Sequence, residues 1–199
     1  MNKQYTLREW QLSDKGSLAE NANNIHIWNN VRDSFPHPYT EKDAEEYLQM
    51  VSEQEMPTTN FAIVVDSKAV GGIGIMLKSD VERATAEIGY WLGEAYWNKG
   101  IMTKVVKEIT YYAFAHFPIK KLYASVFETN VGSARVLYKA GFTKEAVLKK
   151  AIIKNDVIMD LHYYSIETEL NFRISLKISI FALTQPPLRK AMQNGVLKS

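Results

Sequence analysis

Seven residues from Trp97 to Thr103 lie where a predicted strand runs into a predicted helix of about four turns. The N–H groups in the first turn of a helix have no partner within the helix, and the helix dipole adds a partial positive charge there. Such a loop binds phosphate or pyrophosphate wherever its backbone comes close, and Gly100 permits a close approach. An ordinary helix start with a packing glycine is the alternative interpretation.

Hydrophobic spacing predicts the elements that position this loop. Along the chain, segments with the spacing of a strand alternate with segments that have the spacing of a helix. This order predicts one mixed α/β fold whose sheet begins antiparallel. The glycines of residues 70–75 lie inside a predicted strand, where they permit a bulge or the close approach of another backbone. The predicted strands are residues 5–10, 61–65, 70–77, 85–92, 122–127, 142–153 and 157–166, and the predicted helices lie within residues 13–30, 40–54, 100–117 and 130–140.

The composition favours a cytoplasmic globular protein. Hydrophobic residues make up 46% of the 199 residues, and the absence of cysteine excludes disulfides, thiolate metal sites and a cysteine nucleophile. The first residues contain no apolar segment of signal-peptide length, and no apolar run approaches the length of a membrane helix. The sequence therefore predicts neither export nor membrane insertion.

The charge is distributed unevenly along the chain. Residues 168–199 hold five basic residues and one acidic residue, so the first 167 residues carry a net charge of −2. A faintly acidic body argues against nucleic-acid binding and is compatible with a cationic amine as substrate. The histidines His26, His116 and His162 lie far apart without the spacing of metal ligands, so no metal site is predicted.

Several motifs, in the expected order, resemble the Gcn5-related N-acetyltransferase (GNAT) superfamily over roughly residues 5–167. They are Trp97-Asn-Lys-Gly-Ile-Met102 between a strand and a helix, Asn130-x-x-Ser133, and Leu137-Tyr-Lys-Ala-Gly-Phe142. Two further segments, residues 32–44 and residues 86–91, resemble the RimJ/RimL-type branch of ribosomal-protein N-terminal acetyltransferases. The resemblance implies an α/β (α+β) GNAT fold, in which helices flank a mostly antiparallel sheet that splays into a V.

The resemblance also implies acetyl-CoA as co-substrate, with its pyrophosphate at the loop. The family pattern Gln/Arg-x-x-Gly-x-Gly/Ala places Trp97 and Met102 at positions that depart from it, but backbone N–H groups hold the phosphates. Asn130 and Ser133 either bind the pantetheine or cap a helix. The predicted acetyl-CoA contacts are Tyr90, Trp91, Leu92, Trp97, Asn98, Lys99, Gly100, Ile101, Met102, Thr103, Asn130 and Ser133.

Acetyl transfer to an amine needs a neutral nucleophile, stabilisation of the carbonyl oxygen and a proton for the departing thiolate. By resemblance, Tyr138 matches the general acid and Glu87 the base, and a backbone N–H between Tyr90 and Leu92 stabilises the oxygen. An ordinary helix residue is the alternative interpretation of Tyr138. For Glu87 the alternative is an ion-paired strand carboxylate.

His37 and Tyr39 lie in a proline-rich segment that the family places over the acceptor, so they are predicted to contact substrate, and His37 is a second candidate for the base. A surface or packing role is the alternative for His37. The resemblance implies an N-acetyltransferase in which a primary amine, on a protein N-terminus or a small molecule, attacks acetyl-CoA directly in a ternary complex. A CoA-binding sensor or assembly module without catalysis is the alternative function.

Residues 168–199 lie outside the resemblance, which divides the chain into a domain of residues 1–167 and a C-terminal extension. Apolar and polar residues alternate in the extension and predict a strand at residues 173–181. An unpaired apolar strand promotes aggregation, so we expect it to join a sheet edge in its own chain or in a homodimer partner. A poorly ordered extension without function is the alternative.

Overall fold

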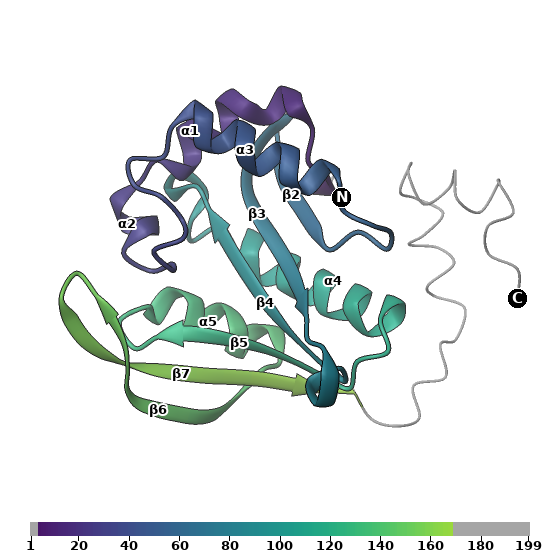
Figure 1. Ribbon diagram of the computed structural model, residues 1–199, viewed down its shortest axis with the longest axis vertical. Coiled ribbons are helices and arrows are strands. Elements are labelled where there is room, and N and C mark those ends of the chain that lie inside the picture. Colours follow the sequence, from purple (N-terminus) through teal and green to yellow (C-terminus); the bar gives the residue numbers. More distant parts are fainter. Residues whose placement is uncertain (1–3, 169–199) are drawn as a thin grey trace, which may run out of the picture. The chain divides into compact units, whose positions relative to one another are not determined.

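The computed structural model describes residues 4–168, and its strands and helices follow the predicted order (Figure 1). The strands are β1 (Thr6–Glu9), β2 (Asn60–Val65), β3 (Lys68–Leu77), β4 (Thr85–Leu92), β5 (Lys121–Phe127), β6 (Thr143–Lys154) and β7 (Val157–Glu167). The helices are α1 (Lys15–Ala22), α2 (Ile25–Trp28), α3 (Glu41–Ser52), α4 (Ile101–His116) and α5 (Val131–Ala140), with 3-10 turns η1 (Leu12–Asp14), η2 (Asp80–Glu82) and η3 (Glu94–Tyr96).

All seven described strands belong to one sheet, in the order β1-β2-β3-β4-β5-β7-β6. Every neighbouring pair is antiparallel except β4 and β5, which pair in parallel over three residues only, from Thr85↔Lys121 to Glu87↔Tyr123. Beyond these pairs the two strands diverge, as Figure 1 shows. The predicted mixed, mostly antiparallel sheet splayed into a V is therefore confirmed.

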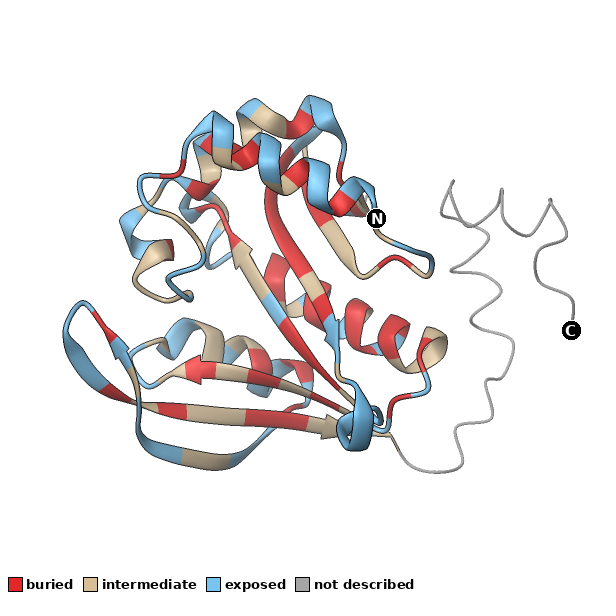
Figure 2. Ribbon diagram, in the orientation of Figure 1, coloured by how far each residue is buried: buried red, intermediate tan, exposed pale blue. Residues whose placement is uncertain are grey.

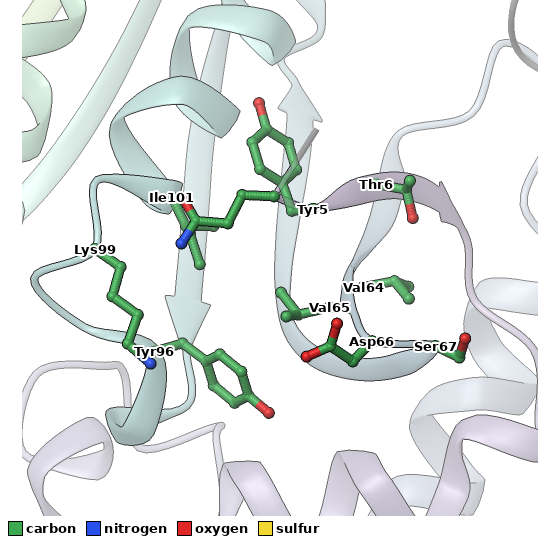
Figure 3. A pocket seen from close by; sticks show the side chains of 10 residues that line it. Tyr5, Thr6, Val64, Val65, Asp66, Ser67, Tyr96, Lys99 and Ile101 are labelled. Carbon is green, nitrogen blue, oxygen red and sulfur yellow. The ribbon is translucent and has the colours of Figure 1, made fainter. Parts of the chain in front are cut away.

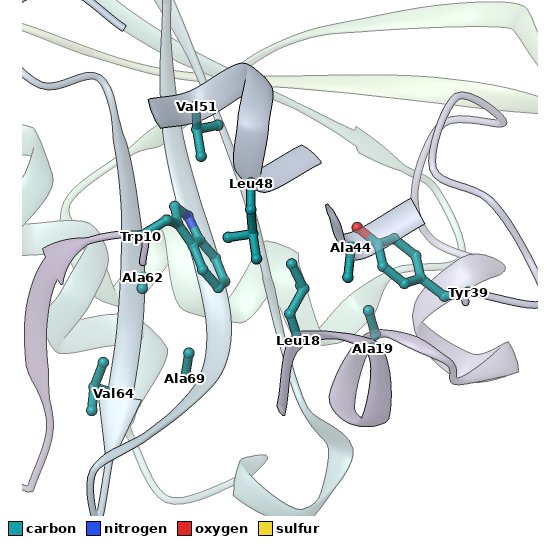
Figure 4. Close-up of a cluster of buried hydrophobic side chains, with 11 residues drawn as sticks. Trp10, Leu18, Ala19, Tyr39, Ala44, Leu48, Val51, Ala62, Val64 and Ala69 are labelled. Carbon is teal, nitrogen blue, oxygen red and sulfur yellow. The ribbon is translucent and has the colours of Figure 1, made fainter. Parts of the chain in front are cut away.

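Helices α1 and α3 pack on one branch of the sheet through a cluster of buried apolar side chains (Figure 4). In α3 the buried residues Ala44, Leu48 and Val51 recur with helical spacing, so they form one stripe that faces β2 and β3. Leu18 of α1 and Leu48 are almost fully buried, and each contributes about 2 kcal/mol to folding. Trp91 of β4 packs against this cluster, so the cluster also supports the strand that precedes the loop of residues 97–103.

Helices α4 and α5 lie on the opposite side of the sheet from α1 and α3, and the buried faces of the helices turn toward the strands (Figures 1 and 2). In α4 the predicted stripe is confirmed, because Ile101, Val105 and Ile109 are all buried. Gly141 ends α5 in the left-handed conformation at φ 101°, as a C-terminal glycine does.

The glycines of β3 have the structural role that the sequence predicts. A Cβ on Gly71 would lie 2.6 Å from the carbonyl oxygen of Trp91, and a Cβ on Gly72 would lie 3.0 Å from the indole nitrogen of Trp91. A side chain at Gly71 would therefore push β3 and β4 apart, and one at Gly72 would displace the indole rings of Trp91 and Trp10. The glycines serve close strand contact and not nucleotide binding.

The predicted C-terminal strand at residues 173–181, and the homodimer expected to form through it, lie outside the described residues. The proposed domain boundary near residue 167 stays a prediction as well. Within residues 4–168, no helix is long and apolar enough to cross a membrane. The predicted cytoplasmic location is not tested by this observation.

Candidate active site

The divergence of β4 and β5 leaves one edge of β4 without a strand partner. Residues 88–92 pair with β3 on one side, but among the described residues they face no strand on the β5 side. Their backbone N–H and C=O groups on that side need hydrogen-bond partners. A ligand that carries amide groups in an extended chain can pair with this edge as an added strand would. We call this region the β4–β5 opening.

The loop from Trp97 to Thr103 joins the far end of β4 to α4. Positive φ angles at Asn98 (59°) and Gly100 (72°) turn the chain sharply before the helix. Within residues 4–168, the N–H groups of Ile101, Met102 and Thr103 donate to no other protein group outside the helix. A Cβ on Gly100 would meet nothing within 4 Å, so the left-handed conformation, and not crowding, requires glycine there.

The two departures from the family pattern have structural explanations. The indole N–H of Trp97 donates to the carbonyl oxygen of Leu92 at 2.6 Å, which braces the loop against the end of β4. Met102 is buried in the core under α4, so its side chain points away from the free N–H groups of the loop. Neither side chain removes a backbone donor, so the departures are compatible with the predicted phosphate site.

Lys99 extends from the loop over the ring of Tyr96, with its Nζ 5.4 Å from the ring centroid. Both residues line an open pocket of about 460 Å³ between the loop, β1 and the β2–β3 turn (Figure 3). Asp66 also lines this pocket, so the charges there are mixed. None of the residues predicted to be catalytic lines it, and we assign the pocket no role in the chemistry.

The start of α5 is tied to β4 across the β4–β5 opening. The side chain of Asn130 accepts a hydrogen bond from the Ser133 N–H at 3.0 Å, which confirms its role as helix cap. The Ser133 hydroxyl lies 2.8 Å from the Tyr90 hydroxyl, and burial raises the pKa of Tyr90. Tyr90 and Ser133 thus brace the helix, and their contact with acetyl-CoA stays a prediction.

Tyr138 lies on the exposed side of α5, with 77% of its surface accessible. Its neighbours Leu137 and Ala140 are buried, so the helix rotation that packs them turns Tyr138 outward. No hydrogen bond occupies its hydroxyl within the described chain. The phenol is therefore free to meet a bound ligand, which is what a general acid requires.

The carboxylate of Glu87 lies at the apex of the V, with only 11% of its side chain exposed. Its Oε1 accepts from the Ser125 hydroxyl at 2.9 Å and lies 3.4 Å from the Arg32 guanidinium. Its Oε2 accepts from Lys78 Nζ at 3.2 Å and from the Tyr123 hydroxyl at 3.3 Å. The ion-paired interpretation of Glu87 is confirmed, and its role as base stays a prediction.

In this network the carboxylate of Glu87 lies between two cations, Arg32 and Lys78. Burial raises the pKa of Tyr123, so its hydroxyl stays protonated and can donate at neutral pH. A hydrogen bond with Tyr123, together with the pairing to Glu87, raises the pKa of Lys78, which keeps its charge. Sequence reasoning missed these partners of Glu87, because Arg32, Lys78 and Ser125 come from separate segments without a shared motif.

The segment predicted to cover the acceptor packs mainly through its aromatic rings. Phe35 lies between Tyr39 and Trp91, with ring centroids 4.9 and 5.9 Å away. Tyr39 is buried in the core cluster, and this position favours packing over substrate contact. His37 is exposed, and its ring centroid lies 5.7 Å from that of Trp28.

The β6–β7 turn and the α2 segment lie on the side where the V is open (Figure 1), and side-chain contacts join them. Lys154 is 3% exposed, and its Nζ lies 3.6 Å from the ring centroid of Trp28 and 2.6 Å from Asp33 Oδ1. The Asn155 amide donates to Asn29 Oδ1 at 2.9 Å. We call these contacts the Lys154 bridge, and they join the two branches of the sheet.

One group of neighbouring side chains consists of residue types that can bind a metal ion, although the spacing of the histidines in the sequence predicts no metal site. Ligand atoms of Glu128, Asp160 and His162 lie within 4.8 Å of one another. Both oxygens of Asp160 already bind donors, namely Lys149 Nζ at 2.6 Å and the Lys150 N–H at 2.9 Å. A cation would have to displace these donors, and the prediction of no metal stays a prediction.

The sheet splits into a V, and a helix with free N–H groups in its first turn begins at the opening. These are the features of the α/β fold that the resemblance predicts. The chain belongs to the GNAT family, because the family described as Acetyltransferase (GNAT) domain matches residues 4–143. The solved structure of RimL, a ribosomal alpha-N-protein acetyltransferase in complex with coenzyme A, has the same fold with a TM-score of 0.73. It is 18% identical and is matched over 83% of this chain and 95% of that chain.

Relatives in sequence carry related names. The probable N-acetyltransferase YjcK of Bacillus subtilis (strain 168) is 34% identical over 119 residues, which are 60% of this chain and 66% of that protein. The ribosomal-protein-serine acetyltransferase of Escherichia coli (strain K12) is 28% identical over 95 residues, 47% of this chain and 53% of that protein. The matches thus span about half to two thirds of these relatives, and they confirm the resemblance to the ribosomal-protein branch.

Proposed function

We propose that the protein is an acetyl-CoA-dependent N-acetyltransferase in which a primary amine attacks the thioester directly. Family membership and the names of the relatives support this reaction class. The observation that carries the proposal is the path from the unpaired edge of residues 88–92 to the free N–H groups at the start of α4. Pantetheine amides suit the strand edge, and a pyrophosphate suits the helix start.

In the proposed reaction, a bond forms between the amine nitrogen and the acetyl carbon while the carbon–sulfur bond breaks. The thiolate leaves with the electron pair of that bond, and the Tyr138 hydroxyl donates a proton to it. The amine must lose a proton, yet both oxygens of Glu87 already hold donors. The Ser125 hydroxyl therefore accepts the amine proton and passes its own to Glu87.

The proposed acceptor is the N-terminal amine of a protein. The E. coli relative is named a ribosomal-protein-serine acetyltransferase, and RimL is named an alpha-N-protein acetyltransferase. A small-molecule amine remains the second acceptor class, since the same scaffold serves different substrates. Release of CoA from acetyl-CoA, measured with a panel of small amines and N-terminal peptides, separates the two.

We expect Tyr138→Phe to lower kcat by about one hundred- to ten-thousand-fold while acetyl-CoA binding is retained, because only the proton donor is removed. Tyr111→Phe is the matched control, since Tyr111 is an exposed tyrosine on α4. Equal turnover of both variants would remove Tyr138 from the mechanism. Acetyl-CoA binding without turnover for any amine would favour the sensor or assembly module, and no binding at all would contradict the proposal.

A further inference from the structure

Arg32 is the least constrained member of the Glu87 network. Its side chain is 70% exposed, and its guanidinium lies 3.4 Å from Glu87 Oε1, which is long for a hydrogen bond. Three other donors, from Ser125, Tyr123 and Lys78, approach the same carboxylate at 2.9 to 3.3 Å. Glu87 is therefore satisfied without Arg32, and the guanidinium has donors to spare.

The charges around Arg32 do not balance. Arg32 and Lys78 bring two positive charges to the single carboxylate of Glu87. Asp33 is adjacent in sequence, but its carboxylate binds Lys154 at 2.6 Å in the Lys154 bridge. One positive charge is thus left over at the apex of the V. A guanidinium presents a planar fork of donors that fits a carboxylate in a bidentate pair.

We propose that Arg32 selects acceptors that carry a carboxylate close to the reacting amine. This inference rests on the proposed function, because it places the amine at the Ser125 and Glu87 end of the same network. The carboxylate of the acceptor replaces Glu87 as the partner of Arg32 and orients the amine. Two sources share this chemistry: the α-carboxylate of a free amino acid and an acidic second residue of a protein N-terminus.

Binding of acetylated products tests the proposal without any turnover. The probes are two matched pairs: N-acetylserine with N-acetylserinamide, and the N-acetylated, C-terminally amidated peptides serine-aspartate-alanine and serine-asparagine-alanine. Tryptophan fluorescence in the presence of CoA reports binding, since Trp91 lies on the same face of β4 as Glu87. We expect one carboxylate probe to bind about tenfold more tightly than its neutral partner.

The variants separate recognition from structure. Arg32→Gln should reduce the preference to less than about twofold, and Arg32→Lys should retain part of it, because lysine keeps the charge without the fork. Arg83→Gln is the control, since Arg83 is exposed and binds only the Asp80 carbonyl in the described chain. It should retain the full preference.

Each outcome is decisive for the proposal. The pair that shows the preference identifies the source of the carboxylate. The proposal is overturned if neither carboxylate probe binds more tightly than its neutral partner, failure to bind included. It is also overturned if Arg32→Gln weakens acidic and neutral probes equally, since Arg32 would then be structural. A failure of acetyl transfer in the CoA-release assay would count against the proposed function alone.

Discussion

At the scale of single residues, the proposed chemistry depends on the partners of one buried carboxylate, that of Glu87. Glu87 is the last residue of β4 that pairs with β5, so the parting of the strands opens space beside it. Its oxygens hold hydroxyl donors from Ser125 and Tyr123 as well as the charged amine of Lys78. Removal of a charge from such a network leaves its partners unpaired, which costs more than the pair itself contributes.

We expect Glu87→Gln to lower kcat/KM by at least about a hundredfold, because the amide cannot take up the proton that Ser125 passes on. The measurement is kcat/KM at neutral pH, from the release of CoA. Glu145→Gln is the control, since Glu145 is an exposed carboxylate paired with Lys121. An unchanged kcat/KM in Glu87→Gln would assign the base to another group.

At the scale of elements, the decisive feature is the start of α4. Gly100 precedes the helix in the left-handed conformation and provides no side-chain cap, which leaves the first-turn N–H groups free. Trp97 fixes the loop to β4, and Ile101 and Met102 anchor the helix in the core. A rigid helix start with free donors is what an anion needs, because no rearrangement has to accompany binding.

We expect Gly100→Ala to lower the free energy of unfolding by about 1–2 kcal/mol, because an alanine in the left-handed conformation is strained. The distorted loop should also weaken CoA binding about tenfold. Gly16→Ala is the control: Gly16 lies in α1 with ordinary φ and nothing within 4 Å of an added Cβ. It should stabilise the protein by about 0.5–1 kcal/mol and leave CoA binding unchanged.

Chemical unfolding and calorimetric titration with CoA measure both effects of the glycine substitutions. A Gly100→Ala variant that binds CoA as tightly as the unsubstituted protein would show that the loop geometry is not needed for the anion. Equal changes in Gly100→Ala and Gly16→Ala would show that helix propensity alone explains the stability.

At the scale of the described domain, two branches of one sheet must be held at a stable angle. Three residue pairs between β4 and β5 join them at the apex. On the open side, the Lys154 bridge joins the β6–β7 turn to the α2 segment. A buried lysine amine over an indole ring is a strong contact because little water competes for the charge.

We expect Lys154→Met to lower the free energy of unfolding by about 1–2 kcal/mol, because the amine loses both Trp28 and Asp33 while the apolar stem keeps its packing. Lys149→Met is the matched control in the same hairpin. Lys149 also lies 2.6 Å from a carboxylate, that of Asp160, but its side chain is 78% exposed. Its loss should cost less than about 0.5 kcal/mol.

Urea unfolding of the two lysine variants checks this prediction. Hydrogen exchange of the β6–β7 turn adds a local measurement, since loss of the bridge should increase exchange there and leave β1 to β3 unchanged. Similar losses of stability in Lys154→Met and Lys149→Met would show that the bridge does not hold the branches together.

Much of the fold could be predicted because its signals are local. The hydrophobic spacing that predicts the helix within residues 100–117 depends on residues within a few positions of one another. The Thr40 cap and the left-handed Gly141, which the structure shows at helix ends, are local features of the same kind. The prediction that α3 reaches about Gln54 agrees within two residues with the observed end at Ser52, after which Glu53 has ψ near 1°. Helix ends are set by tertiary contacts as well as by caps.

The sequence by itself determined the order of the elements and the helical spacing of α4, since these follow from local periodicity. Only the tertiary structure decided which side chains meet Glu87, why Trp97 can replace a polar residue, and that Lys154 closes the open side of the V. Such contacts join residues dozens of positions apart, and no periodicity in a chain encodes which distant segments will touch.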